Sequence, residues 1–166
     1  MEHITISLWS LALLIAVALA FDFMNGFHDG ANSISTIVAT GALTPKQAVL
    51  FAAFFNFAAL WIFELRVAAT IGKGTVDPAL VDHFVIFGAL MGALIWNIIT
   101  WYYGIPSSSS HALVGGLVGA TVVKAGGLTP IVWSGFGKIL IFIIMSPLVG
   151  FLIGGLMMVG VAWVFR

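Results

Sequence analysis

The chain has 166 residues, of which 61% are hydrophobic and only 7% are charged, and its formal net charge is zero. Because a soluble domain typically carries about 25% charged residues, this composition excludes an ordinary soluble protein and indicates an integral membrane protein. The balanced charge gives no reason to expect nucleic acid as a partner, and the absence of cysteine excludes disulfides and thiol chemistry.

The apolar segments predict an all-α, polytopic helical bundle. They approach the ~20 residues that a helix needs to cross a bilayer, and none shows the strict alternation of a membrane strand. The first span is expected over residues 4–24. It lacks the basic start and the clear cleavage site of a signal peptide, so we expect it to be retained. A polar cluster occupies residues 25–36, and a short apolar stretch, residues 37–43, follows it.

Further apolar segments follow along the chain. Thr44 suits the N-cap of the next helix, with a proline at the first helical position, and this span is expected over residues 47–71. Another span is expected over residues 83–103, a short half-helix within residues 105–125, and two last spans that divide near Pro147.

Residues 1–166 are therefore expected to form one membrane domain, with about five full spans and two interrupted segments near residues 25–36 and 105–125. The six basic residues fall on no single side of an alternating topology, so the orientation in the membrane stays open. Glycine pairs four residues apart, such as Gly88 with Gly92, are explained by close helix packing.

The cluster at residues 25–36 reads NGFHDGANSIST. Gly26 and Gly30 lie beside its polar face, so we expect the helix to unwind there, which a membrane helix tolerates where it is buried in protein or lines a wet cavity. On an idealised helix of ~3.6 residues per turn, the polar side chains fall on one stripe. The members of this stripe are Asp22, Asn25, Asp29, Asn32, Thr36 and Thr40.

This stripe has the chemistry to bind ions of either sign. The start of a half-helix directs free N–H groups at an anion, and unwound carbonyls with Asp and Asn oxygens suit a cation. An aspartate at mid-bilayer costs roughly 2.5–3.5 kcal/mol, which is hard to justify for structure alone. The alternatives are that Asp22 lies at an interface and Asp29 in a loop. A bond to a carbonyl is the simplest role for His28, although its reference pKa of ~6.5 would also let it carry a proton.

The second cluster lies in GIPSSSSHALVGG. Pro106 ends the preceding helix, and serines are good N-caps, so residues 107–110 predict a helix N-terminus rich in hydroxyl donors. Hydroxyls and free N–H groups can replace water around a tetrahedral oxyanion. A plain cap is the alternative, and His111 fits a structural role as well as a ligand. Two polar breaks in apolar segments are the pattern of a secondary transporter.

The segments NGFHDGANSISTIVATGALTPKQA and WNIITWYYGIPSSSSHALVGGLVGA resemble the paired signatures of the PiT inorganic phosphate transporter family. The resemblance covers about residues 10–160 and implies one repeat of an inverted-repeat transporter, with a phosphate and coupling-cation site between two half-helix breaks. Carried over by position, the phosphate-site residues are Asn25, Asp29, Asn32, Ser108, Ser109 and Ser110, and the hydroxyl-rich run ends at His111.

The resemblance also implies a coupling cation, either a proton or sodium, and no resident cofactor or metal. We expect this cation at Asp29, Asn32 and Asp22, with His28 and His111 as auxiliary proton carriers. The GFHD form resembles the bacterial branch, which implies proton coupling, co-transport of a metal–phosphate complex, and the plasma membrane of a bacterium or archaeon. The family's chains carry a second half, so the partners expected beside phosphate and lipid are a missing carboxy-terminal half or a second copy of this chain.

A symport mechanism follows from the residues. A cation or proton that neutralises Asp29 makes entry of an anion favourable, and each ligand then lowers the cost of the other. Monohydrogen phosphate has an O–H to donate to the carboxylate, and sulfate has none at neutral pH, so this contact favours phosphate. The expected function is secondary active symport of inorganic phosphate rather than an enzymatic reaction.

The sequence is also compatible, to different degrees, with functions other than symport. A sulfate permease of the same family and an inactive half-transporter fit the same residues. A channel would need a continuous polar lining, whereas polarity here is concentrated at two breaks. An intramembrane protease is disfavoured because serine and histidine three residues apart in a capping segment do not form a nucleophile elbow.

Overall fold

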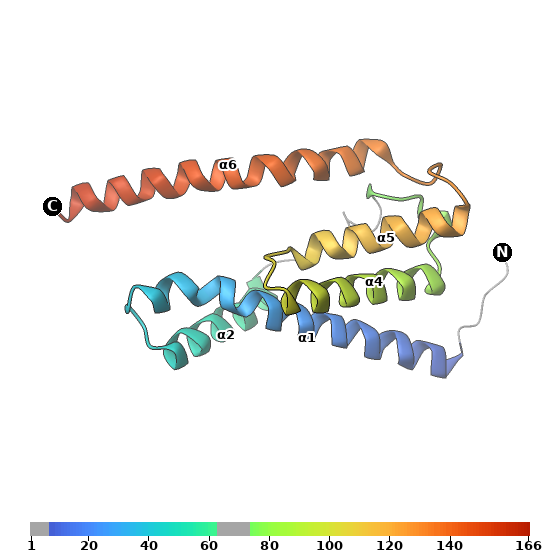
Figure 1. Cartoon of the computed structure of the whole chain (residues 1–166), viewed down its shortest axis with the longest axis horizontal. Coiled ribbons are helices and arrows are strands. Elements are labelled where there is room, and N and C mark those ends of the chain that lie inside the picture. Colours follow the sequence, from blue (N-terminus) through green and yellow to red (C-terminus); the bar gives the residue numbers. More distant parts are fainter. Residues whose placement is uncertain (1–6, 63–73) are drawn as a thin grey trace.

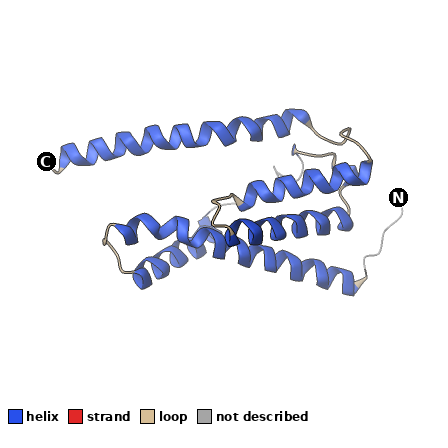
Figure 2. Ribbon diagram, viewed as in Figure 1, coloured by secondary structure: helices blue, strands red, loops and turns tan. Residues whose placement is uncertain are grey.

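The computed structural model describes residues 7–62 and 74–166, which form helices connected by short loops (Figure 1 and Figure 2). Three of the helices are long and apolar enough to cross a membrane, namely α1, α4 and α6, which confirms the expected all-α membrane fold. The elements are α1 (Leu8–Ala39), α2 (Pro45–Ile62), the 3₁₀ turn η1 (Pro78–Leu80), α4 (His83–Tyr102), α5 (Ser109–Ala125) and α6 (Trp133–Val164).

Helix α1 runs for 32 residues without interruption. Ser7 caps its start by accepting a hydrogen bond from the Ser10 amide, and the left-handed Gly41, at φ 73°, follows its end. The unwinding expected at Gly26 and Gly30 is therefore wrong. Neither glycine removes a backbone donor, and a glycine inside a helix costs only about 1 kcal/mol relative to alanine, so the ladder of backbone hydrogen bonds persists through the polar cluster.

Helix α6 is also continuous, with Pro147 inside its 32 residues. The division expected near Pro147 is wrong, because a proline removes one backbone hydrogen bond and membrane helices tolerate this loss. The ends of two expected spans, residues 4–6 and 63–71, lie outside the described residues. The structure therefore leaves the expected number of spans untested.

Helices α4 and α5 form a tightly packed hairpin, and α1 packs beside α4. A Cβ atom on Gly116 would lie 2.4 Å from the carbonyl oxygen of Ala89, and one on Gly88 would lie 3.4 Å from the Ala120 Cβ. Small residues thus allow the two backbones to touch, as in other membrane helix pairs. This confirms the packing role expected for Gly88.

Polar contacts join α4 and α5 at the end of the hairpin where α4 begins and α5 ends, which we call the open end. Asp82 caps α4 by accepting from the Val85 amide, and it also pairs with Lys124 at 2.9 Å. Lys124 donates a second bond to the carbonyl oxygen of Leu80, at 3.0 Å. At the opposite end, the chain turns between Tyr102 and Ser109, which places the serine run at the tip.

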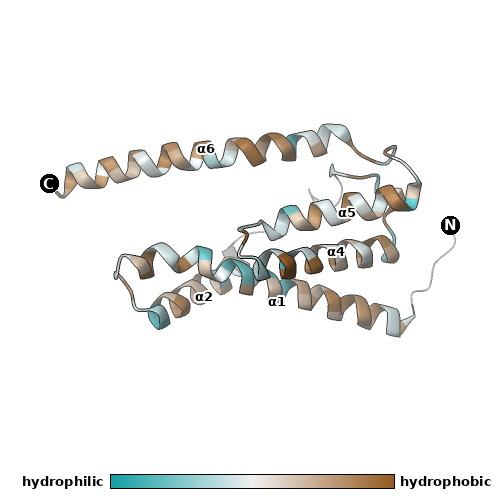
Figure 3. Ribbon diagram, viewed as in Figure 1, coloured by the Kyte–Doolittle hydropathy of each residue, from teal (hydrophilic) through white to brown (hydrophobic). Residues whose placement is uncertain are grey.

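The tip of the hairpin reaches only part of the way along the long helices. Figure 1 shows that the last turns of α1, the helix α2 and the second half of α6 continue beyond it. Helix α6 has no buried residue among those that the structure describes. In Figure 3 the hydrophilic residues of α1 gather near the tip, whereas α6 and the first half of α1 are mainly hydrophobic.

Candidate functional site

The two polar clusters of the sequence lie side by side where α1 passes the tip of the hairpin. The Ser109 hydroxyl points at Asp29 Oδ2 from 3.5 Å, across 80 residues of sequence. This distance exceeds the usual ~2.5–3.0 Å of an O–H···O bond, so the contact is weak. Ser109 is buried, but the Asp29 side chain is 41% exposed. The carboxylate therefore has room for a further ligand.

His28 is buried and contacts one polar side chain on α1 and one on α4. Its Nε2 lies 3.2 Å from Thr100 Oγ1, and its Nδ1 lies 3.3 Å from Asp29 Oδ1. Thr100 Oγ1 is also 2.9 Å from the carbonyl oxygen of Trp96, to which it donates. His28 thus connects the carboxylate of α1 to the hydroxyl of α4.

The contacts of His28 restrict where its protons can lie. A threonine hydroxyl carries one proton, and two backbone carbonyls are within reach of Thr100 Oγ1. When that proton is on a carbonyl, Nε2 of His28 is the donor toward Thr100. In a neutral imidazole the other nitrogen is then an acceptor, and it faces a carboxylate oxygen that is also an acceptor. The pair is satisfied when one proton lies between Nδ1 and Oδ1.

Asn97 is a member of this region that the sequence patterns did not reveal. It is fully buried on α4, one turn from Thr100. Within the described part of the chain, neither its Nδ2 nor its Oδ1 has a hydrogen-bond partner. Buried amides without partners are rare. A polar residue inside the apolar span at 83–103 was the available signal, but a single residue forms no motif.

A cavity of about 340 Å³ opens beside His28. Polar side chains from α1 and α4 line it, and residues of the turn at the hairpin tip form another part of its wall. No group of three or more His, Asp or Glu side chains converges anywhere within residues 7–62 and 74–166. The residues that line the cavity are His28, Asn32, Thr100, Trp101, Gly104, Ile105 and Pro106.

The predicted site residues of α1 lie in different surroundings: some face the cavity or the hairpin tip, and others do not. Asn32 lines the cavity beside His28, and Asp29 faces the hairpin tip. Asp22 is exposed and Asn25 is half-buried, and neither forms a hydrogen bond or ion pair with the described residues. Asp22 precedes Asp29 by about 10 Å of helix.

The serines of the tip do not act alike. Ser108 is the N-cap of α5 and accepts from the His111 amide, which confirms the helix N-terminus expected there. Of the serines at the tip, Ser109 is the one whose hydroxyl faces the Asp29 carboxylate. Ser110 and His111 instead line a separate cavity between α5 and α6.

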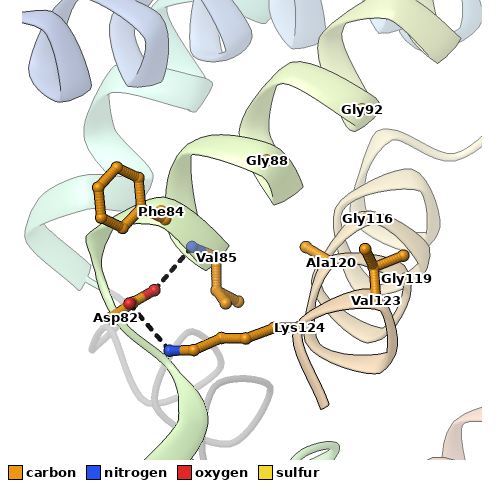
Figure 4. Close-up of a pocket in the computed structure, with 10 residues that line it drawn as sticks. All are labelled: Asp82, Phe84, Val85, Gly88, Gly92, Gly116, Gly119, Ala120, Val123 and Lys124. Carbon is orange, nitrogen blue, oxygen red and sulfur yellow. Dashed lines mark hydrogen bonds and ion pairs between the residues drawn. The ribbon is translucent and has the colours of Figure 1, made fainter. Parts of the chain in front are cut away.

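Another hollow lies away from these residues, on the glycine-lined face of α4 and α5 (Figure 4). Its volume is about 620 Å³. Figure 4 shows its two charged groups, Asp82 and Lys124, bound to each other at the open end of the hairpin. A groove with mutually satisfied charges offers little to an ion, so the junction around His28 and Asp29 is the better candidate.

Comparisons with known proteins agree on one family. A model described as the phosphate transporter family matches residues 25–166. A "probable low-affinity inorganic phosphate transporter" of Rhizobium meliloti is 58% identical, over 92% of this chain and 45% of the relative. The protein of the same description in Bacillus subtilis is 46% identical, over 93% of this chain and 46% of the relative.

A more distant relative is a "putative phosphate permease" of Pyrococcus abyssi, 42% identical over 86% of this chain and 36% of the relative. This chain thus spans less than half the length of these relatives. No solved structure matches it.

Proposed function

This chain belongs to the phosphate transporter family, and we propose that it binds inorganic phosphate together with a coupling proton at the junction of α1 and the hairpin tip, as part of a symporter. It is a multi-pass membrane protein, and its family is one of transporters rather than enzymes. The observation that carries the proposal is the contact of His28 with both Thr100 and Asp29.

The contact favours a proton over sodium as the coupling ion. Thr100 uses its only proton on a carbonyl, so His28 and Asp29 are compatible neighbours when they share a proton. Proton loading turns the acidic pair into a neutral one, or into an imidazolium beside a carboxylate. Either form repels a phosphate dianion less than the unprotonated pair does. Proton binding and phosphate binding therefore favour each other.

Phosphate is preferred over sulfate by the acceptor at this site. Asp29 Oδ2 faces the tip with only a weak contact from Ser109, so it can accept the O–H of monohydrogen phosphate. Sulfate lacks that O–H donor. Bound sulfate would leave the Asp29 acceptor without a hydrogen bond, so sulfate should bind more weakly than phosphate. The Ser109 hydroxyl and Asn32 are placed to donate to the other phosphate oxygens.

The site is open on one side, which suits completion by a second half. This chain spans less than half of the Rhizobium meliloti and Bacillus subtilis relatives, and Asp29 and Asn32 keep exposed faces. We propose that an inverted second repeat covers these faces, either from further chain or from a second copy. The side-chain amide of Asn97 has no hydrogen-bond partner among the described residues. It could therefore form one when the site is filled.

Radiolabelled phosphate uptake into liposomes tests the function. The chain is reconstituted alone and as a chimera in which it replaces the matching segment of the Rhizobium meliloti relative. We expect uptake that follows an imposed acid gradient and does not require sodium. Uptake that follows sodium at constant pH would refute the proton, and equal uptake of labelled sulfate would favour a sulfate permease. Divalent metal is varied in the same experiment, because a metal–phosphate substrate would make uptake depend on it.

A further inference from the structure

Helix α6 contains one charged residue, Lys138, in its second turn. A lysine in a membrane span costs roughly 2.5–3.5 kcal/mol at the bilayer centre and less toward the ends, so such residues usually have a partner or a function. The ion pairs among the described residues join His28 to Asp29 and Lys124 to Asp82. Lys138 belongs to neither pair.

Lys138 lines a cavity of about 450 Å³ between α5 and α6, which we call the α5–α6 cavity. Ser110 and His111 enter it from the first turn of α5, and Ser146 enters it from α6. Among residues 7–62 and 74–166, no aspartate or glutamate lines it. The wall is otherwise mostly apolar, so the polar groups are concentrated on few side chains.

The donor set of the α5–α6 cavity is suited to an anion. An ammonium group has three donors and no acceptor, hydroxyls can donate, and an imidazole always has at least one N–H. This differs from the junction on the other side of α5, where the carboxylate of Asp29 is an acceptor. Ser109 faces that junction and Ser110 faces the cavity, because successive residues of a helix point about 100° apart.

We propose that the α5–α6 cavity is a second oxyanion site, in which Lys138 binds tetrahedral dianions without distinguishing phosphate from sulfate. The proposal rests on the proposed function, to which it adds a first binding step that attracts anions by charge. Selection belongs to Asp29, whose acceptor rewards the phosphate O–H. In the part of the chain that the structure describes, the α5–α6 cavity has no carboxylate to favour that O–H, so both anions bind there.

Inhibition by sulfate tests the proposal. Phosphate uptake is measured at increasing sulfate for the wild type, Lys138→Gln, Lys138→Arg and the control Lys46→Gln, which removes an equal charge from an exposed position on α2. We expect sulfate to inhibit the wild type. Lys138→Gln should raise both the sulfate inhibition constant and the phosphate KM about tenfold, the scale of one charged hydrogen bond. Lys138→Arg and Lys46→Gln should stay close to the wild type.

An unchanged inhibition constant in Lys138→Gln would overturn the proposal. A lysine that only anchors α6 at the membrane interface would give that result, with less protein inserted into the liposomes. A lysine that binds the phosphate of a lipid headgroup would also give it. In that case the effect of Lys138→Gln on uptake would appear in phosphatidylglycerol liposomes and be absent in phosphatidylcholine alone.

Failure of the proposed function has a different signature. If the wild type takes up no phosphate, transport is refuted, and the cavity is tested by direct binding of labelled sulfate to the purified protein. Binding that is lost in Lys138→Gln and kept in Lys138→Arg supports the second site on its own. Equal binding by the wild type and Lys138→Gln refutes the site whatever the transport result.

Discussion

His28 Nε2 lies 3.2 Å from Thr100 Oγ1, and this contact joins the polar stripe of α1 to the buried face of α4. The threonine hydroxyl is also 2.9 Å from the Trp96 carbonyl oxygen, and when its proton is on that carbonyl, His28 Nε2 is the donor of the contact. In the proposed mechanism, a side chain on α4 thus influences which nitrogen of His28 carries a proton next to Asp29.

Replacing Thr100 by valine should weaken proton coupling. Without an acceptor for Nε2–H, neutral His28 can place its proton on Nδ1 and donate to Asp29, so the pair no longer needs an extra proton. We expect uptake to persist with a flatter dependence on pH. The measurement is the pH profile of uptake, with Thr100→Ser, which keeps the hydroxyl, as the matched control. An unaltered profile in Thr100→Val would argue against the proton arrangement.

Asp29 and Asp22 provide a direct comparison of two acidic residues on one stripe. Asp29→Asn removes the negative charge and the group that can share a proton with His28 at the hairpin tip, so coupled uptake should be abolished. Asp22→Asn alters an exposed side chain about two turns away and should leave uptake within about twofold of the wild type, a change below ~0.5 kcal/mol. Ion-dependent uptake at full rate in Asp29→Asn would remove Asp29 from the mechanism.

The serines of the tip should separate into a binding role and a structural role. Ser109→Ala removes the hydroxyl that faces Asp29 and should raise the phosphate KM about tenfold, the scale of one hydrogen bond to a charged group. Ser108→Ala removes the N-cap of α5 and should lower the free energy of unfolding by about 0.5–2 kcal/mol. Uptake kinetics and thermal unfolding in detergent measure the two effects. A KM change in Ser108→Ala that exceeds the change in Ser109→Ala would reverse the assignment.

Gly116 and Gly119 test the close packing of the hairpin. Alanine at Gly116 would place its Cβ 2.4 Å from a backbone oxygen of Ala89, whereas the same change at Gly119 meets nothing within 4 Å. Overpacking of this kind typically costs about 1–3 kcal/mol. We expect Gly116→Ala to lower the melting temperature in detergent and Gly119→Ala to leave it close to the wild type. Equal melting temperatures would show that the two helices accommodate the added methyl group at no cost in stability.

The ion pair at the open end of the hairpin should depend on pH. The hydrogen bond from Lys124, together with that from the Val85 amide, lowers the pKa of Asp82 below its ordinary value of 3.8. A lowered pKa means that the stabilisation is present above pH ~3.8 and is lost as the pH falls through the pKa of the folded state.

Asp82→Asn isolates this ion pair, because asparagine is an equally good N-cap. It should therefore lower the melting temperature slightly at neutral pH, since exposed pairs contribute about 0.2–1 kcal/mol, and have a smaller effect near pH 3, below the ordinary pKa of 3.8. Melting curves of the two proteins at both pH values check this. A difference that persists unchanged at low pH would point to the cap rather than to the charge.

The sequence predicted the parts of the fold that local patterns determine. Length and apolarity identified the membrane helices, and the serine run identified the cap of α5 at Ser108. The breaks expected at Gly26 and Pro147 are absent, because glycine and proline weaken a helix without ending it when the neighbouring backbone hydrogen bonds persist. A glycine or a proline is therefore an unreliable indicator of a helix break inside a long apolar helix.

The parts that were not predicted depend on which helix faces meet. Asn97 and Thr100 are single polar residues in an apolar span, and only the packing of α4 against α1 and α5 shows that they belong to the site. The separation of Ser109 from Ser110 depends in the same way on the rotation of α5 about its axis. Proximity of the two signatures was implied by a family resemblance, and spacing alone did not establish it.

The approach of Gly116 to Ala89 limits how the protein can move. Two helices whose backbones touch have no compressible layer between them, so the hairpin resists sliding or splaying and turns as one stiff body. Its contacts with α1 are fewer and include the single histidine–threonine link. If the proposed transporter exposes the tip first to one face of the bilayer and then to the other, the contact surface between α1 and the hairpin is where movement would occur, and the His28–Thr100 contact lies on that surface.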